Sequence, residues 1–154
     1  MGKLYVVRHA DAGHRLGADE LDEPRVLSPR GWRQAEGLRA QLAGAGIARL
    51  IASPFVRCVQ TLEPLGAHLG LTVEQDERLA ERRAAADLLE LAAEVRSVTA
   101  VLCSHGDVIP EVLTALVASG TRFKDELRWQ KASTWVLTWN GDHLAKGTYL
   151  PPPA

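Results

Sequence analysis

Two arginines and two histidines stand at the ends of short apolar runs in three separate parts of the chain. Arg8 and His9 close the first run, at residues 3–7. Arg57 comes shortly after a second run, and His105 comes directly after a later one. If the runs are strands of one parallel sheet, their carboxyl ends meet at one edge, which is where open α/β sheets bind ligands. Guanidinium and imidazole groups gathered there predict a pocket for an anion, above all a phosphoryl group.

His9 is the candidate nucleophile of such a pocket. A neutral imidazole is nucleophilic near neutral pH and, unlike a serine hydroxyl, needs no strong base to activate it. In-line attack on phosphorus would make a phosphohistidine. Arg8 and Arg57 would bind the non-bridging oxygens with their forked donors. His105 would donate to the same phosphoryl group and stabilise charge in the transition state.

Three motifs of the chain resemble those of a known family. They are Arg8-His9-Ala10, the pattern Ser-Pro-x-x-Arg-x-x-x-Thr at residues 53–61, and Ser104-His105-Gly106. As an ordered set they resemble the histidine phosphatase superfamily, the phosphoglycerate mutase-like group. Residues 8–13 look most like its small bacterial branch, which includes phosphohistidine phosphatases and phosphatase-like domains that follow a Nudix domain. The resemblance implies a metal-independent phosphatase that hydrolyses a phosphomonoester or a phosphoprotein, including phosphohistidine, through an intermediate on His9.

The resemblance also implies a general acid between the second and third motifs, and we assign this role to Glu81. One carboxyl group can protonate the leaving oxygen and then deprotonate the attacking water. Glu77, Asp87, Asp11 and Asp107 remain rivals, although Asp107 is expected to cap a helix. A solvated Glu81 that pairs with a neighbouring arginine is the plainer alternative.

Two further cations are candidates for phosphate contacts. Many mutases carry an asparagine shortly after the first motif, and Arg15 stands nearby in this chain. We therefore assign Arg15 as an additional phosphate donor, with a loop arginine outside the site as the alternative. For Lys131, a contact with the substrate and a solvated position are equally acceptable.

The elements that must position these residues follow from apolar runs and turn signals. Asn140-Gly141 between two such runs is a strong hairpin signal. We expect strands at residues 3–8, 48–52, 71–75, 99–104, 134–139 and 143–150. Strands that alternate with helices indicate an α/β three-layer sandwich, with a mostly parallel sheet flanked by helices and a C-terminal antiparallel hairpin at the sheet edge.

Two serine-proline pairs predict helix starts, because serine is a good N-cap and proline suits the first helical position. Ser28-Pro29 opens one helix, and Ser53-Pro54 opens another that is kinked near Pro64 and carries Arg57 in its first turn. Residues 10–27 show no period and are expected to form a loop. Two more helices follow from apolar spacing, which predicts inward-facing Leu88, Leu91, Ala92 and Val95, and then Val112, Leu113, Leu116 and Val117.

The composition fits one domain over residues 1–154. A net charge of -1 gives no general attraction to nucleic acid or membranes, and no apolar stretch is long enough to cross a bilayer. Cys58 and Cys103 are expected to be buried free thiols in a reducing compartment. We therefore expect a cytoplasmic protein that binds a phosphorylated small molecule or phosphoprotein, with no nucleic acid, membrane, cofactor or metal ion.

Three other classes of protein stay open. A metallohydrolase would have to use His9, Asp11 and His14, which make no standard ligand set. A catalytically silent phosphate-binding regulatory module would keep the same cationic groups. A phosphomutase would need to retain and re-orient its product. The sequence does not decide the physiological substrate or the oligomeric state.

Overall fold

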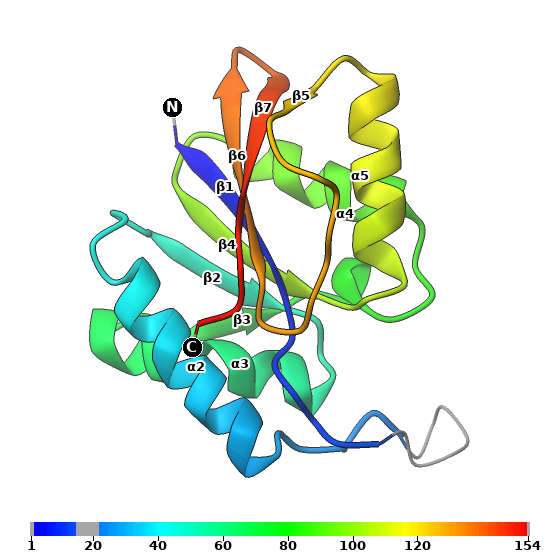
Figure 1. Ribbon diagram of the computed structural model, residues 1–154. Helices are drawn as coiled ribbons and strands as arrows, with labels where there is room; N and C mark the ends of the chain where they lie inside the picture. Colours follow the sequence, from blue (N-terminus) through cyan, green and yellow to red (C-terminus); the bar gives the residue numbers. More distant parts are fainter. Residues whose placement is uncertain (1, 15–21, 154) are drawn as a thin grey trace.

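One seven-stranded sheet organises the part of the chain that the computed structural model describes, residues 2–14 and 22–153 (Figure 1). The strand order is β3-β2-β4-β1-β6-β7-β5. β6 pairs antiparallel with both β1 and β7, and the other neighbouring strands pair in parallel. The strands are β1 (Lys3–Arg8), β2 (Arg49–Ala52), β3 (Val73–Gln75), β4 (Ala100–Ser104), β5 (Arg122–Phe123), β6 (Thr134–Asn140) and β7 (His143–Leu150).

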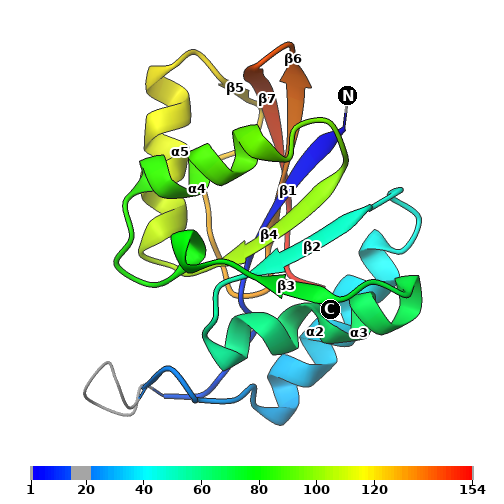
Figure 2. The same cartoon turned by 180° about the vertical axis from the view of Figure 1, so that it is seen from behind.

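Helices cover both faces of the sheet, so the predicted three-layer α/β fold is confirmed (Figures 1 and 2). α2 and α3 pack together on one face, and α4 and α5 on the other. The described helices are α2 (Pro29–Leu42), α3 (Val56–Leu69), α4 (Ala85–Glu94) and α5 (Val108–Ala118), with a single 3₁₀ turn, η1 (Glu77–Leu79). None of them is both long and apolar enough to cross a membrane. The predicted hairpin β6–β7 lies towards one edge, with only the two-residue β5 beyond it.

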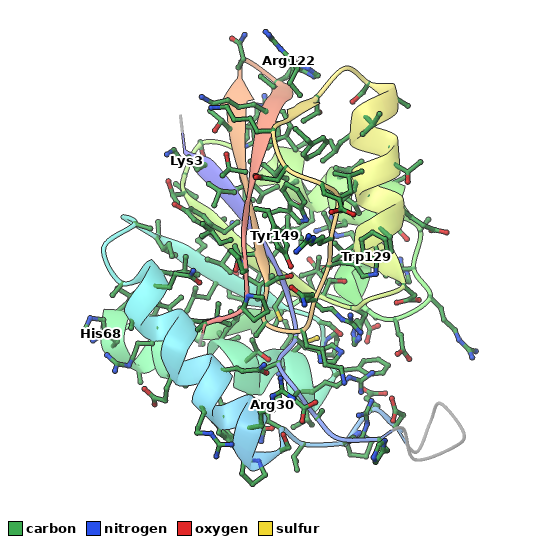
Figure 3. The ribbon with its side chains drawn as sticks, viewed as in Figure 1. Lys3, Arg30, His68, Arg122, Trp129 and Tyr149 are labelled. Atoms are coloured by element: carbon green, nitrogen blue, oxygen red, sulfur yellow. The ribbon has the colours of Figure 1, made fainter. Side chains whose placement is uncertain are left out.

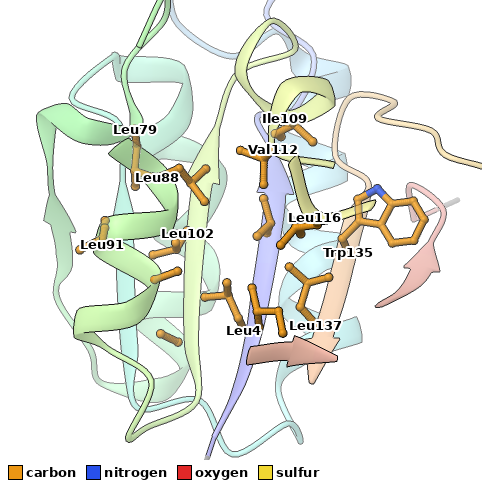
Figure 4. Packing of buried hydrophobic residues seen from close by; sticks show 14 of the residues in the cluster. Leu4, Leu79, Leu88, Leu91, Leu102, Ile109, Val112, Leu116, Trp135 and Leu137 are labelled. Carbon is orange, nitrogen blue, oxygen red and sulfur yellow. The ribbon is translucent and has the colours of Figure 1, made fainter. Parts of the chain in front are cut away.

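Alternating side chains of the central strand β1 belong to two hydrophobic clusters, one on each face of the sheet. Leu4 and Val6 pack under α4 and α5, while Tyr5 and Val7 pack under α2 and α3. Burying a side chain of this size contributes about 1.5–3 kcal/mol, so β1 is held firmly between the layers. Figure 4 shows the first cluster, in which sheet residues meet helix residues: Leu4, Leu102, Trp135 and Leu137 with Leu88, Leu91, Ile109, Val112 and Leu116.

The start of α3 differs from the prediction. Its first helical residue is Val56 and its N-cap is Phe55, so Ser53 and Pro54 lie before the helix. The Ser53 hydroxyl oxygen accepts from the Phe55 N–H at 3.2 Å and lies 2.9 Å from His105 Nε2. A long-range partner therefore replaces the predicted capping role of Ser53. Pro64 lies inside α3, and the expected kink there stays a prediction.

The start and outer face of α5 also differ from expectation. Asp107 occupies the N-cap position, but its carboxylate makes no capping bond and instead accepts from the Arg82 N–H at 2.8 Å. Val117 is 52% exposed, so the prediction that it faces inward is wrong. It lies at the margin of the apolar stripe formed by Val112, Leu113 and Leu116, which are buried as predicted.

Candidate active site

The carboxyl ends of β1, β2 and β4 meet at one edge of the sheet, as the sequence predicts. Arg8, the last residue of β1, is the register partner of Ser104, the last residue of β4. His105 follows directly, and Ser53 follows the neighbouring strand β2. A cleft of about 610 Å³ opens there and is lined by Arg8, His9, Gly13, Arg25, Arg57, Glu81, Arg82, Gly106, Asp107 and Lys131.

His9 presents a lone pair on Nε2. Its Nδ1 lies 2.8 Å from the carbonyl oxygen of Ala10, and because a carbonyl only accepts, Nδ1 carries the proton. Burial holds the pKa of His9 well below its usual value of 6.5, and the charges of Arg57 and Arg8 lower it further. The imidazole is therefore neutral near pH 7, which is the form that a nucleophile requires.

Thr61 holds the loop that carries His9. Its hydroxyl oxygen accepts from the Ala10 N–H at 2.9 Å and donates to the Arg57 carbonyl oxygen at 2.6 Å. The His9 N–H donates to the Ser104 carbonyl oxygen at 3.1 Å. The last residue of the Ser-Pro-x-x-Arg-x-x-x-Thr pattern thus ties the first motif to α3, a role that the sequence analysis did not assign.

Arg57 links the nucleophile to the predicted acid. Its Nε lies 3.4 Å from His9 Nε2, and its Nη2 lies 3.0 Å from Glu81 Oε1. The same nitrogen is 3.0 Å from Asp22 Oδ2, and Nη1 donates to the Asp22 carbonyl oxygen at 3.0 Å. With 1% of its surface exposed, this guanidinium is fixed by two carboxylates rather than solvated.

Asp22 and Arg25 are site residues that the sequence analysis missed. Asp22 is fully buried and pairs with Arg25 at 2.8 Å as well as with Arg57. Arg25 also donates to the Ala12 carbonyl oxygen at 2.7 Å, which fastens the segment after His9. Both lie in residues 10–27, which show no period and were expected to form a loop. The only local sign of their ion pair is the spacing of an arginine three residues after an aspartate.

His105 is buried beside His9. Its ring is 5.5 Å from that of His9, centroid to centroid, and it is 1% exposed. Its Nε2 lies 2.9 Å from the Ser53 hydroxyl oxygen and 3.6 Å from Cys58 Sγ. Nδ1 has no hydrogen-bond partner among the described residues.

Arg8 also keeps an unused donor. Its Nη1 donates to the Trp129 carbonyl oxygen at 2.9 Å, but its buried Nε has no partner within the described ranges. A Cβ on Gly106 would lie 2.6 Å from Arg8 Cζ, so this position must be glycine for the guanidinium to pack on the backbone. Buried donors are normally satisfied, so the open Nε of Arg8 fits an anionic oxygen.

Glu81 and Asp107 are the carboxylates that line the cleft among the described residues. Glu81 is 9% exposed at its side chain, and the adjacent Arg82 adopts a left-handed backbone conformation with φ of 68°. The bond from the Arg82 N–H to Asp107 stabilises this turn. Asp107 is thus placed to hold the turn that carries Glu81. Of the other rivals, Glu77 and Asp87 do not line the cleft.

The remaining predicted residues have different outcomes. Arg15 lies outside the described residues. Lys131 lines the cleft and is 3.4 Å from Asp11 Oδ1. Cys58 and Cys103 are buried free thiols, as predicted. Within the described ranges, no group of three or more His, Cys, Asp or Glu side chains is arranged to hold a metal ion.

Residues 4–87, more than half of the chain, match the histidine phosphatase superfamily (branch 1). The chain belongs to this superfamily. It is 37% identical over 157 aligned residues to an 8-oxo-(d)GTP phosphatase of Mycolicibacterium smegmatis. That match covers 97% of this chain but 48% of the relative, so the chain spans about half the length of that protein.

Solved structures of low sequence identity share the fold. The protein histidine phosphatase SixA complexed with tungstate aligns with a TM-score of 0.75 at 22% identity, over 99% of this chain and 96% of that one. A putative phosphohistidine phosphatase SixA from Nakamurella multipartitia aligns with a TM-score of 0.75 at 21% identity, over 99% and 97% of the two chains. These likenesses establish the architecture.

Proposed function

We propose that the protein hydrolyses its substrate without a metal ion, through a phosphohistidine intermediate on His9. One observation carries the proposal: Arg57 contacts the lone-pair nitrogen of His9 and a carboxylate oxygen of Glu81 through the same buried guanidinium. A phosphoryl group beside this guanidinium would lie within reach of both nucleophile and acid.

In the first step, His9 Nε2 forms a bond to phosphorus while the bond to the leaving oxygen breaks. Glu81, in its protonated form, gives its proton to that oxygen. A bound phosphoryl dianion competes with Glu81 for Arg57 and, as a like charge, favours the protonated carboxyl group. Arg8, Arg57 and His105 donate to the non-bridging oxygens, where their fixed positions stabilise the transition state.

In the second step, a water molecule attacks phosphorus on the opposite side from His9. Glu81, now a carboxylate, takes a proton from this water, and the bond between Nε2 and phosphorus breaks. Inorganic phosphate leaves and the neutral imidazole is restored. The low pKa of His9 supports this step, because the ring leaves as the neutral species.

An exposed phosphomonoester or a phosphoprotein, phosphohistidine included, is the first candidate substrate class. A nucleotide phosphate is the second candidate, and one specific observation favours it. The relative that is 37% identical over 97% of this chain is an 8-oxo-(d)GTP phosphatase. A phosphomutase is a weaker candidate, because it would have to retain and re-orient its product.

The test is hydrolysis of p-nitrophenyl phosphate in excess EDTA by the wild type, His9→Ala and the control His68→Ala, whose histidine is exposed on α3. We expect activity in the wild type and the control, and a loss of roughly 10³-fold or more in His9→Ala. Acid-labile phosphate should appear on the wild-type enzyme in a rapid quench. Activity lost in EDTA would instead support a metallohydrolase, and inactivity of all three on every phosphorylated substrate would support a silent binding module.

A further inference from the structure

A second hollow adjoins the catalytic cleft and shares Lys131 with it. Its volume is about 750 Å³, and its charged lining residues are Asp11, Arg30, Arg33 and Lys131. Three cations and one carboxylate leave it with a net charge of two positive units. Because Lys131 lines both spaces, a molecule held at His9 can extend into the second hollow along the protein surface.

Arg30 and Arg33 stand one turn apart near the start of α2, where Figure 3 labels Arg30. Both are exposed, and neither side chain has a hydrogen bond or ion pair with another described residue. A positive charge near a helix N-terminus is unfavourable, and the first turn of α2 contains no acidic residue to offset it. Helix stability therefore does not account for these two arginines.

Two glutamines add neutral donors to the same hollow. Gln34 Oε1 accepts from the Asp11 N–H at 2.8 Å, and Gln130 Oε1 accepts from the Tyr149 hydroxyl at 3.1 Å. Since both side-chain oxygens face protein donors, the NH₂ groups are what the glutamines can offer to a ligand. The lining thus consists mainly of hydrogen-bond donors, which suits an anion.

The carboxylate of Asp11 is already engaged. It accepts from the Ser28 hydroxyl at 2.6 Å, and this bond, more than the charge of Lys131, holds the pKa of Asp11 below its usual value. Lys131 Nζ is 3.4 Å from Asp11, which is long for a charge-assisted hydrogen bond. Lys131 can therefore turn towards a ligand anion without giving up a strong contact.

We propose that Arg30, Arg33 and Lys131 bind a second phosphate group of the substrate, so that the enzyme prefers nucleoside polyphosphates to simple monoesters. The inference rests on the proposed function, because the terminal phosphoryl group must sit at His9 while the phosphate chain passes Lys131 towards α2. Guanidinium groups match phosphate oxygens in geometry as well as charge. These residues set specificity and take no part in bond breaking.

The test compares kcat/KM for deoxyguanosine diphosphate and triphosphate with kcat/KM for p-nitrophenyl phosphate, all in excess EDTA. The variant is Arg30→Gln/Arg33→Gln. Its matched control, Arg39→Gln/Arg96→Gln, removes the same charge: Arg39 pairs with Glu36 at the far end of α2, and Arg96 donates to the Ala93 carbonyl oxygen. We expect the variant to lose about tenfold or more on the nucleotides and less than about twofold on the monoester, with the control unchanged.

A second readout needs no nucleotide turnover. Tripolyphosphate should inhibit p-nitrophenyl phosphate hydrolysis by the wild type more strongly than orthophosphate does, and the difference should vanish in the variant. Four outcomes would each overturn the inference. The variant could lose activity equally on both substrate types, lose none on the nucleotides, or lose more on an acidic phosphopeptide than on the nucleotides. The fourth is a wild type that does not hydrolyse the nucleotides at all. In all these cases the wild type would still hydrolyse p-nitrophenyl phosphate in a His9-dependent way. If the wild type did not hydrolyse p-nitrophenyl phosphate, the proposed function itself would have failed.

Discussion

The catalytic cleft and the neighbouring hollow meet at Lys131, yet they are built in different ways. In the cleft, Arg57 is 1% exposed and His9 is 5% exposed, and neighbouring groups fix the orientation of each. In the hollow, Arg30 and Arg33 are exposed and have no partner among the described residues. Bond making needs groups held in place before the substrate arrives, whereas adjustable surface side chains suffice to bind the remainder of the substrate.

This difference has a measurable consequence. Substitutions in the cleft should lower both turnover and stability, because each buried charge depends on another. Substitutions in the hollow should change substrate preference and little else. Changes at Arg57, Glu81, Gly106 and His9 test the cleft side of this contrast.

Arg57→Ala should have the largest effect. It removes the guanidinium that Asp22 and Glu81 share. Asp22 keeps its pair with Arg25, but breaking buried ion pairs of this kind should still lower the free energy of unfolding by about 3 kcal/mol. Urea denaturation measures this loss. The control is Arg49→Ala, whose partly exposed pair with Glu74 should be worth less than about 1 kcal/mol. Similar losses in both variants would remove the distinction between buried and exposed charges.

Glu81→Gln should lower turnover by about 10²–10⁴-fold on substrates with poor leaving groups, the usual contribution of a general acid. The loss should be much smaller on p-nitrophenyl phosphate, whose leaving group needs little proton help. Glu77→Gln, in the 3₁₀ turn away from the cleft, is the control and should leave both rates near the wild type. If Glu81→Gln slows both substrates equally, Glu81 is not the acid, and Asp107 becomes the residue to test.

Gly106→Ala should raise KM by about tenfold, which corresponds to about 1.4 kcal/mol. The new methyl group would meet the Arg8 guanidinium at 2.6 Å and push it off the phosphate position. Steady-state kinetics with p-nitrophenyl phosphate measures the change. Gly44→Ala is the matched control, since its Cβ would meet nothing within 4 Å. An unchanged KM in Gly106→Ala would mean that Arg8 does not need its present position.

The pH dependence of stability should show the smallest effect. Because burial holds the pKa of His9 well below 6.5, the folded protein leaves His9 neutral where the unfolded chain protonates it. The unfolded state then binds more protons, so this contribution to stability is present above about pH 6.5 and falls as the pH is lowered. Between about pH 7 and about pH 5, the free energy of unfolding should fall further in the wild type than in His9→Asn. Parallel pH curves would contradict the neutral, buried state of His9.

The sheet edge could be predicted because strand ends and charged residues coincide in the sequence. Arg8 and Ser104 are register partners, so a motif after each strand necessarily meets the other. Arg57 could be placed because it lies in the first turn of α3 whether the helix starts at Ser53 or at Val56. The hairpin followed from Asn140-Gly141 between two apolar runs. The structure shifts the turn by one residue: Asn140 ends β6, and the turn consists of Gly141, whose φ is 65°, and Asp142.

The contacts that are remote in sequence could not be predicted. The Asp22 carboxylate reaches Arg57 from an aperiodic segment, and no local pattern indicates such a partner. Ser53 bonds to His105 instead of capping α3, because a buried imidazole competes with the helix terminus for the same hydroxyl. Val117 shows that helical spacing predicts the centre of an apolar stripe better than its margin.

The central place of β1 has a consequence for how the chain is made. β1 pairs with β4 on one side and with β6 on the other, and both partners are synthesised much later. A nascent chain on the ribosome must therefore carry a Leu-Tyr-Val-Val strand with both edges unpaired, a state prone to misassembly. The Ala132 N–H donates to the Arg8 carbonyl oxygen, so even the first motif is complete only after residue 132 has emerged. Catalytic activity should therefore appear only late in translation. Because β1 is unpaired until then, we expect chaperones to bind the early nascent chain, which can be measured.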